Sequence, residues 1–134
     1  MNSFPLKIVT PDGMEFEGMA EEVIVRTTTG DLGIMAGHMN CVAPLGMGRA
    51  TFIIDGQKRY AACIGGILSV SKGTVTLVPT TFEWADEIDL DRAATAEAHA
   101  KQILADKNAS NTDLIVAEAK LKRALVRKSV ADYK

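Results

Sequence analysis

The stretch Glu87–Ala100, with the sequence EIDLDRAATAEAHA, marks the point where the chain changes from a strand pattern to a helix pattern. Residues 88–105 contain no glycine or proline and are rich in strong helix formers. Asp89 is expected to cap this helix, because its carboxylate can accept hydrogen bonds from free backbone N–H groups. Capping does not explain Arg92, because the positive end of the helix dipole disfavours a cation in the first turn. Arg92 therefore points to a role beyond helix stability.

Before this stretch, from residue 4 to about residue 82, short apolar or alternating segments are separated by turns. The turn signals are PDG (11–13), TTGD (28–31), DGQ (55–57) and SKG (71–73). Between them, β-branched residues such as those of EEVIVRT (21–27) favour strands. Short strands with a turn about every eight to twelve residues are typical of an antiparallel sandwich or barrel.

Two helices are expected after the strands, because apolar residues then recur with the period of an amphipathic helix. The segment DKNASNT (106–112) interrupts this pattern, and Ser110 with Asp113 has the signature of a capping box for a second helix. A short connection between two helices predicts an antiparallel hairpin. The expected apolar stripes are Ala93, Ala96, Ala100, Ile103 and Leu104 on the first helix, and Leu114, Ala117, Leu121, Ala124 and Leu125 on the second. The sequence thus predicts an all-β sandwich in residues 1–84 followed by a C-terminal antiparallel α-helical hairpin in residues 85–134.

The stripe on the first of these helices consists mostly of alanine. A buried methyl group contributes on the order of 0.8 kcal/mol, whereas a buried Leu or Ile side chain contributes roughly 1.5–3 kcal/mol. Packing within the hairpin, and of the hairpin on the sandwich, is therefore expected to be weak. The alternative is that small side chains let the helices approach closely and form a compact, stable pair. A weakly docked hairpin is an element whose position a ligand or partner can shift.

Composition excludes some classes of function. The chain has 134 residues, a net charge of -2 and a sequence pI of about 5.7, which argues against nucleic acid as a partner, because that requires a concentrated basic surface. Cys41 and Cys63 lack the spacing of a zinc or redox motif, so buried reduced thiols are favoured over a disulfide. The first ten residues lack the apolar region of a signal peptide, and the most apolar run, YAACIGGILSV (60–70), is too short to span a bilayer. We expect a cytosolic chain, or one attached to a membrane peripherally through protein partners.

No catalytic arrangement is evident in the sequence. His38 and His99 lie far apart in segments of different type, and no metal-binding or nucleophile motif accompanies them. The segment GDLGIMAGH (30–38) contains three glycines, but their spacing does not match a phosphate-binding loop. A glycine-rich loop between strands is expected there instead. The chain is therefore expected not to be an enzyme by itself.

Charge is distributed unevenly along the hairpin. Residues 83–97 contain six acidic residues, whereas residues 120–128 contain none. The basic residues of the second segment are Lys120, Lys122, Arg123, Arg127 and Lys128. In an antiparallel hairpin the two segments could form weak ion pairs on solvated surfaces. Alternatively, Arg92, Arg123 and Arg127 converge and bind a phosphate-bearing anion, because guanidinium groups match the geometry of phosphate oxygens.

Several motifs resemble those of the epsilon subunits of bacterial F-type ATP synthases. They are VTPDG (9–13), GDLGIMAGH (30–38), APL (43–45), GGILSV (65–70), VTLV (75–78), EIDLDRA (87–93) and LKRALVRKSVADYK (121–134). The resemblance covers essentially the whole chain. It implies a noncatalytic rotor subunit in the central stalk, peripheral to the cytoplasmic face of the cell membrane, in contact with the gamma subunit and the ring of c subunits. It also implies a role in coupling proton flow to ATP synthesis, and in restraining ATP hydrolysis when the hairpin extends.

Residues 88–93, IDLDRA, resemble the motif with which some members of this family bind ATP. By this resemblance Glu83, Ile88, Asp89 and Ala93 would lie about the nucleoside, while Arg92, Arg123 and Arg127 would face the phosphates. His99 stands where the tight-binding pattern has another arginine. Because imidazole is mostly neutral at about pH 7, weaker binding is expected. MgATP would then be a regulatory ligand, not an obligatory cofactor.

The resemblance assigns two further groups of residues. Asp31 and His38 match positions that meet the c ring and the gamma subunit. An extended hairpin would present Lys120, Lys122, Arg123, Arg127 and Lys128 to acidic surfaces of the catalytic alpha and beta subunits. The alternative is a stand-alone nucleotide-binding β-sandwich regulator that uses the hairpin as a lid.

Overall fold

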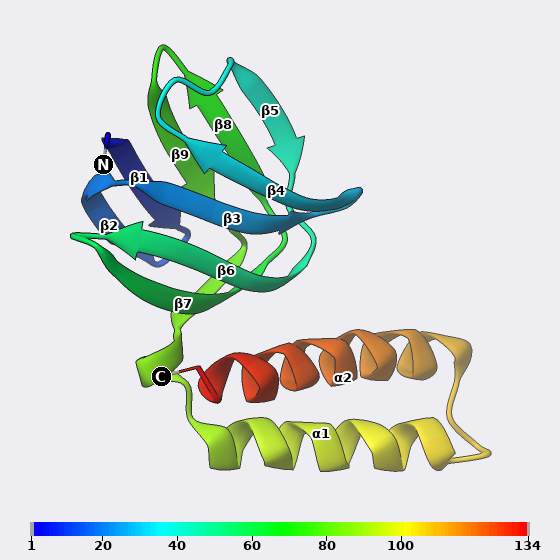
Figure 1. Ribbon diagram of the computed structural model, residues 1–134. Coiled ribbons are helices and arrows are strands. Elements are labelled where there is room, and N and C mark those ends of the chain that lie inside the picture. Colours follow the sequence, from blue (N-terminus) through cyan, green and yellow to red (C-terminus); the bar gives the residue numbers. More distant parts are fainter. Residues whose placement is uncertain (1, 134) are drawn as a thin grey trace.

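The computed structural model describes residues 2–133, which form ten strands followed by two α-helices (Figure 1). The strands are β1 (Phe4–Thr10), β2 (Gly13–Ala20), β3 (Glu22–Thr27), β4 (Gly30–Met35), β5 (Cys41–Pro44), β6 (Met47–Ile54), β7 (Gln57–Ile64), β8 (Ile67–Ser71), β9 (Thr74–Val78) and β10 (Thr81–Trp84). A short 3-10 helix, η1 (Ala85–Glu87), leads to α1 (Leu90–Ala105) and α2 (Asn111–Ala131).

The strands form two five-stranded sheets, in the orders β2-β1-β9-β8-β5 and β10-β7-β6-β3-β4. Neighbouring strands are antiparallel except β1 and β9, which pair in parallel. Alternate residues of each strand face the core between the sheets, so that Phe4, Leu6 and Ile8 of β1 are buried while Pro5 and Lys7 are exposed. This arrangement confirms the predicted β-sandwich.

The segment GDLGIMAGH differs from the expectation. Gly30–Met35 is not a loop but strand β4, which pairs along its length with β3. Ile34 is fully buried and Leu32 packs against the core, so the apolar residues do alternate along the strand. Gly30 and Gly33 obscure this period in the sequence, because glycine carries no side chain to mark a face. Hydrogen-bonded pairing with β3 makes this segment a strand, although its glycine-rich composition does not favour one.

Both helices begin where the sequence predicts. The carboxylate of Asp89 accepts a hydrogen bond from the backbone N–H of Arg92 at 3.0 Å, as an N-cap does. The hydroxyl of Ser110 accepts one from the backbone N–H of Asp113 at 3.1 Å, and the Asp113 carboxylate accepts one from the backbone N–H of Ser110, which completes the capping box. Local hydrogen bonding therefore fixes both starting points.

The alanine seam between the helices is confirmed, and it is narrower than expected. Its fully covered members are Ala93, Ala100, Ala117 and Ala124. Leu104 and Leu125 were expected in the stripe, but 36% and 46% of their surfaces stay exposed. The buried alanines recur every seventh residue, so each helix contributes a single line of contact. Residues beside that line stay exposed where no third layer covers them.

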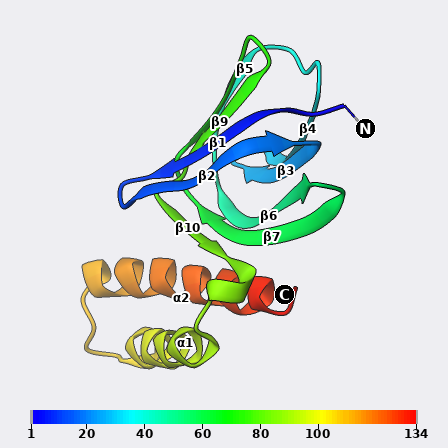
Figure 2. The same cartoon turned by 90° about the vertical axis from the view of Figure 1, so that its left-hand side faces the viewer.

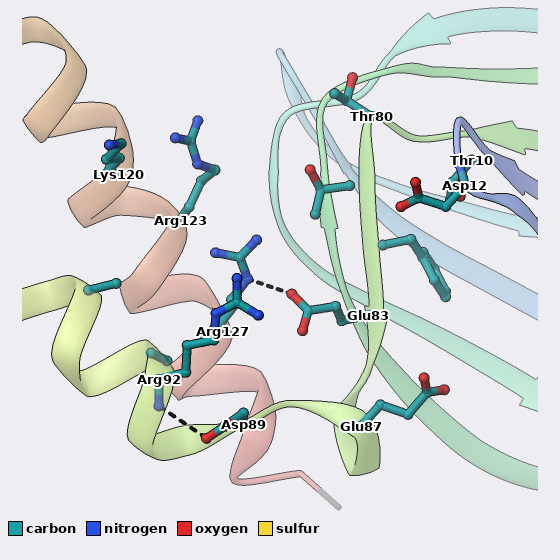
Figure 3. A pocket seen from close by; sticks show the side chains of 14 residues that line it. Thr10, Asp12, Thr80, Glu83, Glu87, Asp89, Arg92, Lys120, Arg123 and Arg127 are labelled. Atoms are coloured by element: carbon teal, nitrogen blue, oxygen red, sulfur yellow. Dashed lines mark hydrogen bonds and ion pairs between the residues drawn. The ribbon is translucent and has the colours of Figure 1, made fainter.

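The hairpin lies against the outer face of the second sheet at β6 and β7, with α2 between α1 and that sheet (Figures 1 and 2). The path to the hairpin depends on Gly66, which has φ +97°. A Cβ atom there would lie 2.1 Å from the Val78 carbonyl oxygen, so only glycine lets the chain after β9 pass this closely. This passage brings Thr80 and Thr81 to the side of the sandwich that faces the hairpin (Figure 3).

Candidate functional site

The hairpin contacts the sandwich through the C-terminal end of α2. Val130 and Ala131 are buried in a small apolar cluster with Ala62, Ala85 and Ile88. Beyond the helix, the centres of the Tyr133 and Tyr60 rings lie 5.0 Å apart, and the guanidinium of Arg49 lies 4.1 Å from the centre of the Tyr133 ring. These contacts define a junction, which consists of the apolar cluster together with Tyr60, Tyr133 and Arg49.

A cleft of about 610 Å³ separates the sandwich from the part of the hairpin beyond this junction (Figure 3). It is lined by Thr10 and Asp12, by Thr80, Thr81, Phe82, Glu83, Glu87 and Asp89, by Arg92, Ala93 and Ala96 of α1, and by Lys120, Arg123 and Arg127 of α2. The cleft lies between parts of the chain that are distant in sequence. Its volume falls within the range of about 300–1,000 Å³ that is usual for ligand sites.

One wall of the cleft is basic. Lys120, Arg123 and Arg127 follow one another at i, i+3 and i+7 on one face of α2, and Arg92 joins them from α1. Arg127 donates to the carboxylate of Glu83 on β10. Arg92, Lys120 and Arg123 form no ion pair with any residue from 2 to 133. Three cations therefore face the cleft without a carboxylate partner in the part of the chain that the structure describes.

The opposite wall carries hydroxyl and carboxylate groups. Thr10, Asp12, Thr80, Thr81 and Glu83 of the sandwich contribute polar oxygen atoms to it, while Glu87 of η1 and Asp89, the N-cap of α1, lie at the end of the cleft where the chain enters α1. An elongated ligand with an anionic end and a neutral polar end would meet cations on the helices and hydrogen-bonding oxygens on the sandwich. This polarity suits a phosphorylated molecule with hydroxyl or amino groups at its other end.

The structure brings together six of the eight residues that the family resemblance assigns to a nucleotide. Glu83, Asp89, Arg92, Ala93, Arg123 and Arg127 line the cleft. Ile88 does not line it, because its side chain is buried in the junction against α2. His99 lies on α1 beyond Ala96, is exposed and does not line it either. Whether any of the eight contacts a nucleotide remains a prediction.

Several lining residues were not anticipated as ligand contacts. Lys120 was assigned only to the basic surface of the second helix, although its spacing of three and seven residues from Arg123 and Arg127 is a signal that it shares their face. Asp12 and Thr80 could not be found from the sequence. They belong to connections of the sandwich, and long-range packing alone brings them to the hairpin.

The five basic residues of α2 do not form one surface in this docked arrangement. Lys120, Arg123 and Arg127 face the cleft. Lys122 pairs with Glu118 along the helix at 3.5 Å, and Lys128 reaches across the hairpin to Glu97 at 2.9 Å. The hydrogen bond from Lys128 holds the pKa of Glu97 below its ordinary value.

Asp31 and His38, the predicted partner contacts, lie away from the cleft at β4 and the segment after it. The Asp31 carboxylate is exposed and 3.3 Å from Nη1 of Arg26. Nδ1 of His38 lies 2.8 Å from the carbonyl oxygen of Met39, a residue with 82% of its surface exposed. The side chains near these two residues are thus a mixture of charged and apolar groups on the surface.

The two cysteines are free thiols, as the sequence suggests, but only Cys63 is buried, whereas Cys41 is half-buried. Burial raises the pKa of the Cys63 thiol to about 12, so this thiol stays uncharged and packs as a small apolar side chain. No group of three or more His, Cys, Asp or Glu side chains within residues 2–133 is arranged to hold a metal ion. No helix in the same range is long and apolar enough to cross a membrane.

Two family models match the chain: the ATP synthase delta/epsilon chain beta-sandwich domain over residues 3–85, and the delta/epsilon chain long alpha-helix domain over residues 86–132. Curated relatives include the ATP synthase epsilon chain of Ruminococcus albus, which is 42% identical over 100% of both chains. The epsilon chain of an Exiguobacterium species is 40% identical over 100% of this chain and 99% of the relative.

The fold also matches a solved structure. A chain in the cryo-EM structure of the Euglena gracilis mitochondrial ATP synthase, OSCP/F1/c-ring, aligns with a TM-score of 0.83 at 21% identity, over 98% of this chain and 82% of that one. The names of the relatives confirm the expectation of a subunit of a larger complex rather than an enzyme by itself. Because the two family models together match nearly the whole sequence, this chain belongs to the family of ATP synthase delta and epsilon chains.

Proposed function

We propose that this chain is a central-stalk subunit of a proton-translocating ATP synthase, and that ATP bound in the cleft holds its hairpin in the docked arrangement. The observation that carries the proposal is the basic wall, in which Arg92 of α1 and Arg123 of α2 face the cleft without an ion-pair partner among residues 2–133. Gathered cations repel one another unless an anion lies between them. A polyphosphate fits that requirement, because guanidinium groups match phosphate oxygens.

Binding in the cleft would stabilise the docked arrangement. A ligand there touches α1, α2 and the sandwich at once, and these contacts are lost if the hairpin moves away. A ligand shifts such a balance only by its difference in affinity for the two arrangements. At a free concentration of one hundred times Kd, a ligand specific for the docked arrangement stabilises it by about 2.7 kcal/mol. That is comparable to what the small apolar cluster at the junction can supply.

When the cleft is empty, the hairpin extends and restrains ATP hydrolysis. Loss of the docked arrangement would free Arg127 from Glu83 and uncover the half-buried Arg123, next to the already exposed Lys120. The basic side of α2 then faces acidic surfaces of the alpha and beta subunits. The hairpin thereby acts as a brake that high ATP keeps disengaged, while the chain couples rotation to ATP synthesis.

The sandwich attaches the chain to its partners. In this proposal Asp31 and His38 contact the c ring and the gamma subunit, which hold the chain peripherally at the cytoplasmic face of the membrane. Support comes from the exposed Met35, Met39 and Val42 beside them, since exposed apolar groups near charges are typical of interfaces. Solved structures of the same fold come from an OSCP/F1/c-ring assembly in one case and from a central stalk/c-ring assembly in the other.

Calorimetric titration of the isolated chain tests the ATP site. ATP is expected to bind more tightly than ADP or AMP, and Arg92→Ala should weaken ATP binding by about 1.5–3 kcal/mol, the range for hydrogen bonds to charged groups. Lys101→Ala is the matched control, because Lys101 lies on the same helix, pairs with Glu97 and does not line the cleft. Absence of ATP binding at millimolar concentration, or equal losses in both variants, would reject the site.

Two measurements on the assembled enzyme test the rest of the proposal. Removal of residues 88–134 should raise ATP hydrolysis at low ATP while ATP synthesis is largely kept. Unchanged hydrolysis would mean that the hairpin is no brake. Asp31→Arg should weaken assembly with the gamma and c subunits, because it reverses a charge at the proposed contact. Equal assembly across a range of salt concentrations would remove Asp31 from the interface.

A further inference from the structure

Lys120 differs from the other lysines of helices α1 and α2. Lys101, Lys122 and Lys128 each pair with a glutamate. Lys120 lines the cleft and forms no ion pair with any residue from 2 to 133. Its charge is therefore available to a ligand in the cleft.

The position of Lys120 along α2 places it at one end of the basic wall. With a rise of about 1.5 Å per residue, Lys120, Arg123 and Arg127 span roughly 10 Å along the helix axis. Arg127 and Arg92 lie at the end of the cleft near Asp89, and Lys120 lies at the far end, beyond Arg123 (Figure 3). A chain of phosphates that starts near Arg92 and follows α2 would meet Lys120 last.

We propose that Lys120 contacts the terminal phosphate of the bound nucleotide and so sets the preference of the cleft for triphosphates over diphosphates. This inference rests on the proposed nucleotide site. The ammonium group is a compact charge on a flexible stem, so it can reach a terminal group whose position varies. Lys120 thereby places a cation at the outer end of the cleft. His99 supplies no charge there, because it is exposed and does not line the cleft.

Calorimetry with the full chain and three ligands, ATP, ADP and inorganic tripolyphosphate, tests the inference. Lys120→Met keeps the length of the side chain and removes its charge at an exposed helical position, so folding should be unaffected. The variant should lose about tenfold in ATP affinity, the low end for a hydrogen bond to a charged group, while ADP binding changes little. Lys120→Arg should keep the preference for ATP over ADP.

Lys122→Met is the matched control, because it removes the same charge from the same helix but outside the cleft. If wild type binds ATP and Lys120→Met weakens ATP and ADP equally, or no more than Lys122→Met does, the role of Lys120 is refuted while the nucleotide site stands. If wild type binds tripolyphosphate in a Lys120-dependent manner but not ATP, the proposed nucleotide function fails and the polyphosphate contact stands. Absence of binding to all three ligands overturns both.

Discussion

The sandwich and the hairpin are held together by side chains of very different size. Between the sheets, large residues such as Phe52, Leu6 and Leu68 are fully buried. Between the helices, the fully covered residues are alanines, and the junction with the sandwich adds Val130, Ile88 and a few small groups. The two regions therefore differ in how much free energy fixes their structure.

This difference separates the roles of the two regions. A buried Phe or Leu contributes about 1.5–3 kcal/mol and a buried methyl group on the order of 0.8 kcal/mol, so the sandwich has a large reserve of stability and the docked hairpin has little. A ligand that binds in the cleft acts on the region with the smaller reserve. The sandwich can then serve as a fixed platform while the hairpin changes position.

The largest effect is expected in the core of the sandwich. Phe52 is fully buried and its ring makes edge contacts with the rings of Phe82 at 6.1 Å and Trp84 at 5.4 Å. Phe52→Ala should lower the free energy of unfolding by about 3–5 kcal/mol in urea denaturation. Ile115→Ala, at a position on α2 that is 70% exposed, should stay within about 0.5 kcal/mol of wild type. Similar losses of unfolding free energy in both variants would show that the sandwich core and the hairpin surface do not differ in this way.

An enlarged residue in the alanine seam should disturb the hairpin alone. Ala124 is fully buried between the helices, so Ala124→Leu forces them apart at a cost of about 1–3 kcal/mol. Hydrogen exchange should become faster in α1 and α2 and stay unchanged in the sheets. The control is Ala98→Leu, at an exposed position of α1. Unfolding of the sandwich together with the hairpin would show that the two are one cooperative unit.

The sequence predicts the parts of this structure that depend on neighbouring residues. Asp89 and Ser110 cap their helices through hydrogen bonds that reach only three residues along the chain, so both starts could be placed in advance. Strand β4 was missed because its structure depends on pairing with β3 and not on its own glycine-rich composition.

The cleft shows the same limit. The charge pattern of the hairpin left open whether Arg92, Arg123 and Arg127 converge, and the family resemblance assigned them to one site; all three line the cleft. Asp12 and Thr80 were not assigned to that site, because only the packing of α2 against the outer face of the second sheet brings them opposite those arginines. Long-range geometry thus supplies one wall of the cleft.

A smaller effect is expected at the C-terminal part of the junction. Tyr133 contacts both Arg49 and Tyr60, and loss of its ring removes a cation–π contact and an aromatic pair. Tyr133→Ala should weaken docking of the last turn of α2 by roughly 1–2 kcal/mol. Faster hydrogen exchange at residues 129–131 would report it. Tyr133→Phe keeps the ring and should behave as wild type, so an equal effect of the two substitutions would exclude a role for ring packing.

The smallest effect concerns the ion pair across the hairpin. The Glu97 side chain is 13% exposed, and the hydrogen bond from Lys128 lowers its pKa from the ordinary value of 4.5. Because the folded state binds this proton less readily than the unfolded state, the pair stabilises the hairpin above about pH 4.5 and loses its effect as the pH falls through the lowered pKa. Hydrogen exchange in α1 and α2 should therefore differ between wild type and Glu97→Gln at neutral pH, and the difference should shrink in acid. Glu118→Gln is the control, because Glu118 and its partner Lys122 are each 62% exposed and should contribute less. A difference between wild type and Glu97→Gln that persists unchanged into acid would mean that this carboxylate contributes through packing and not through its charge.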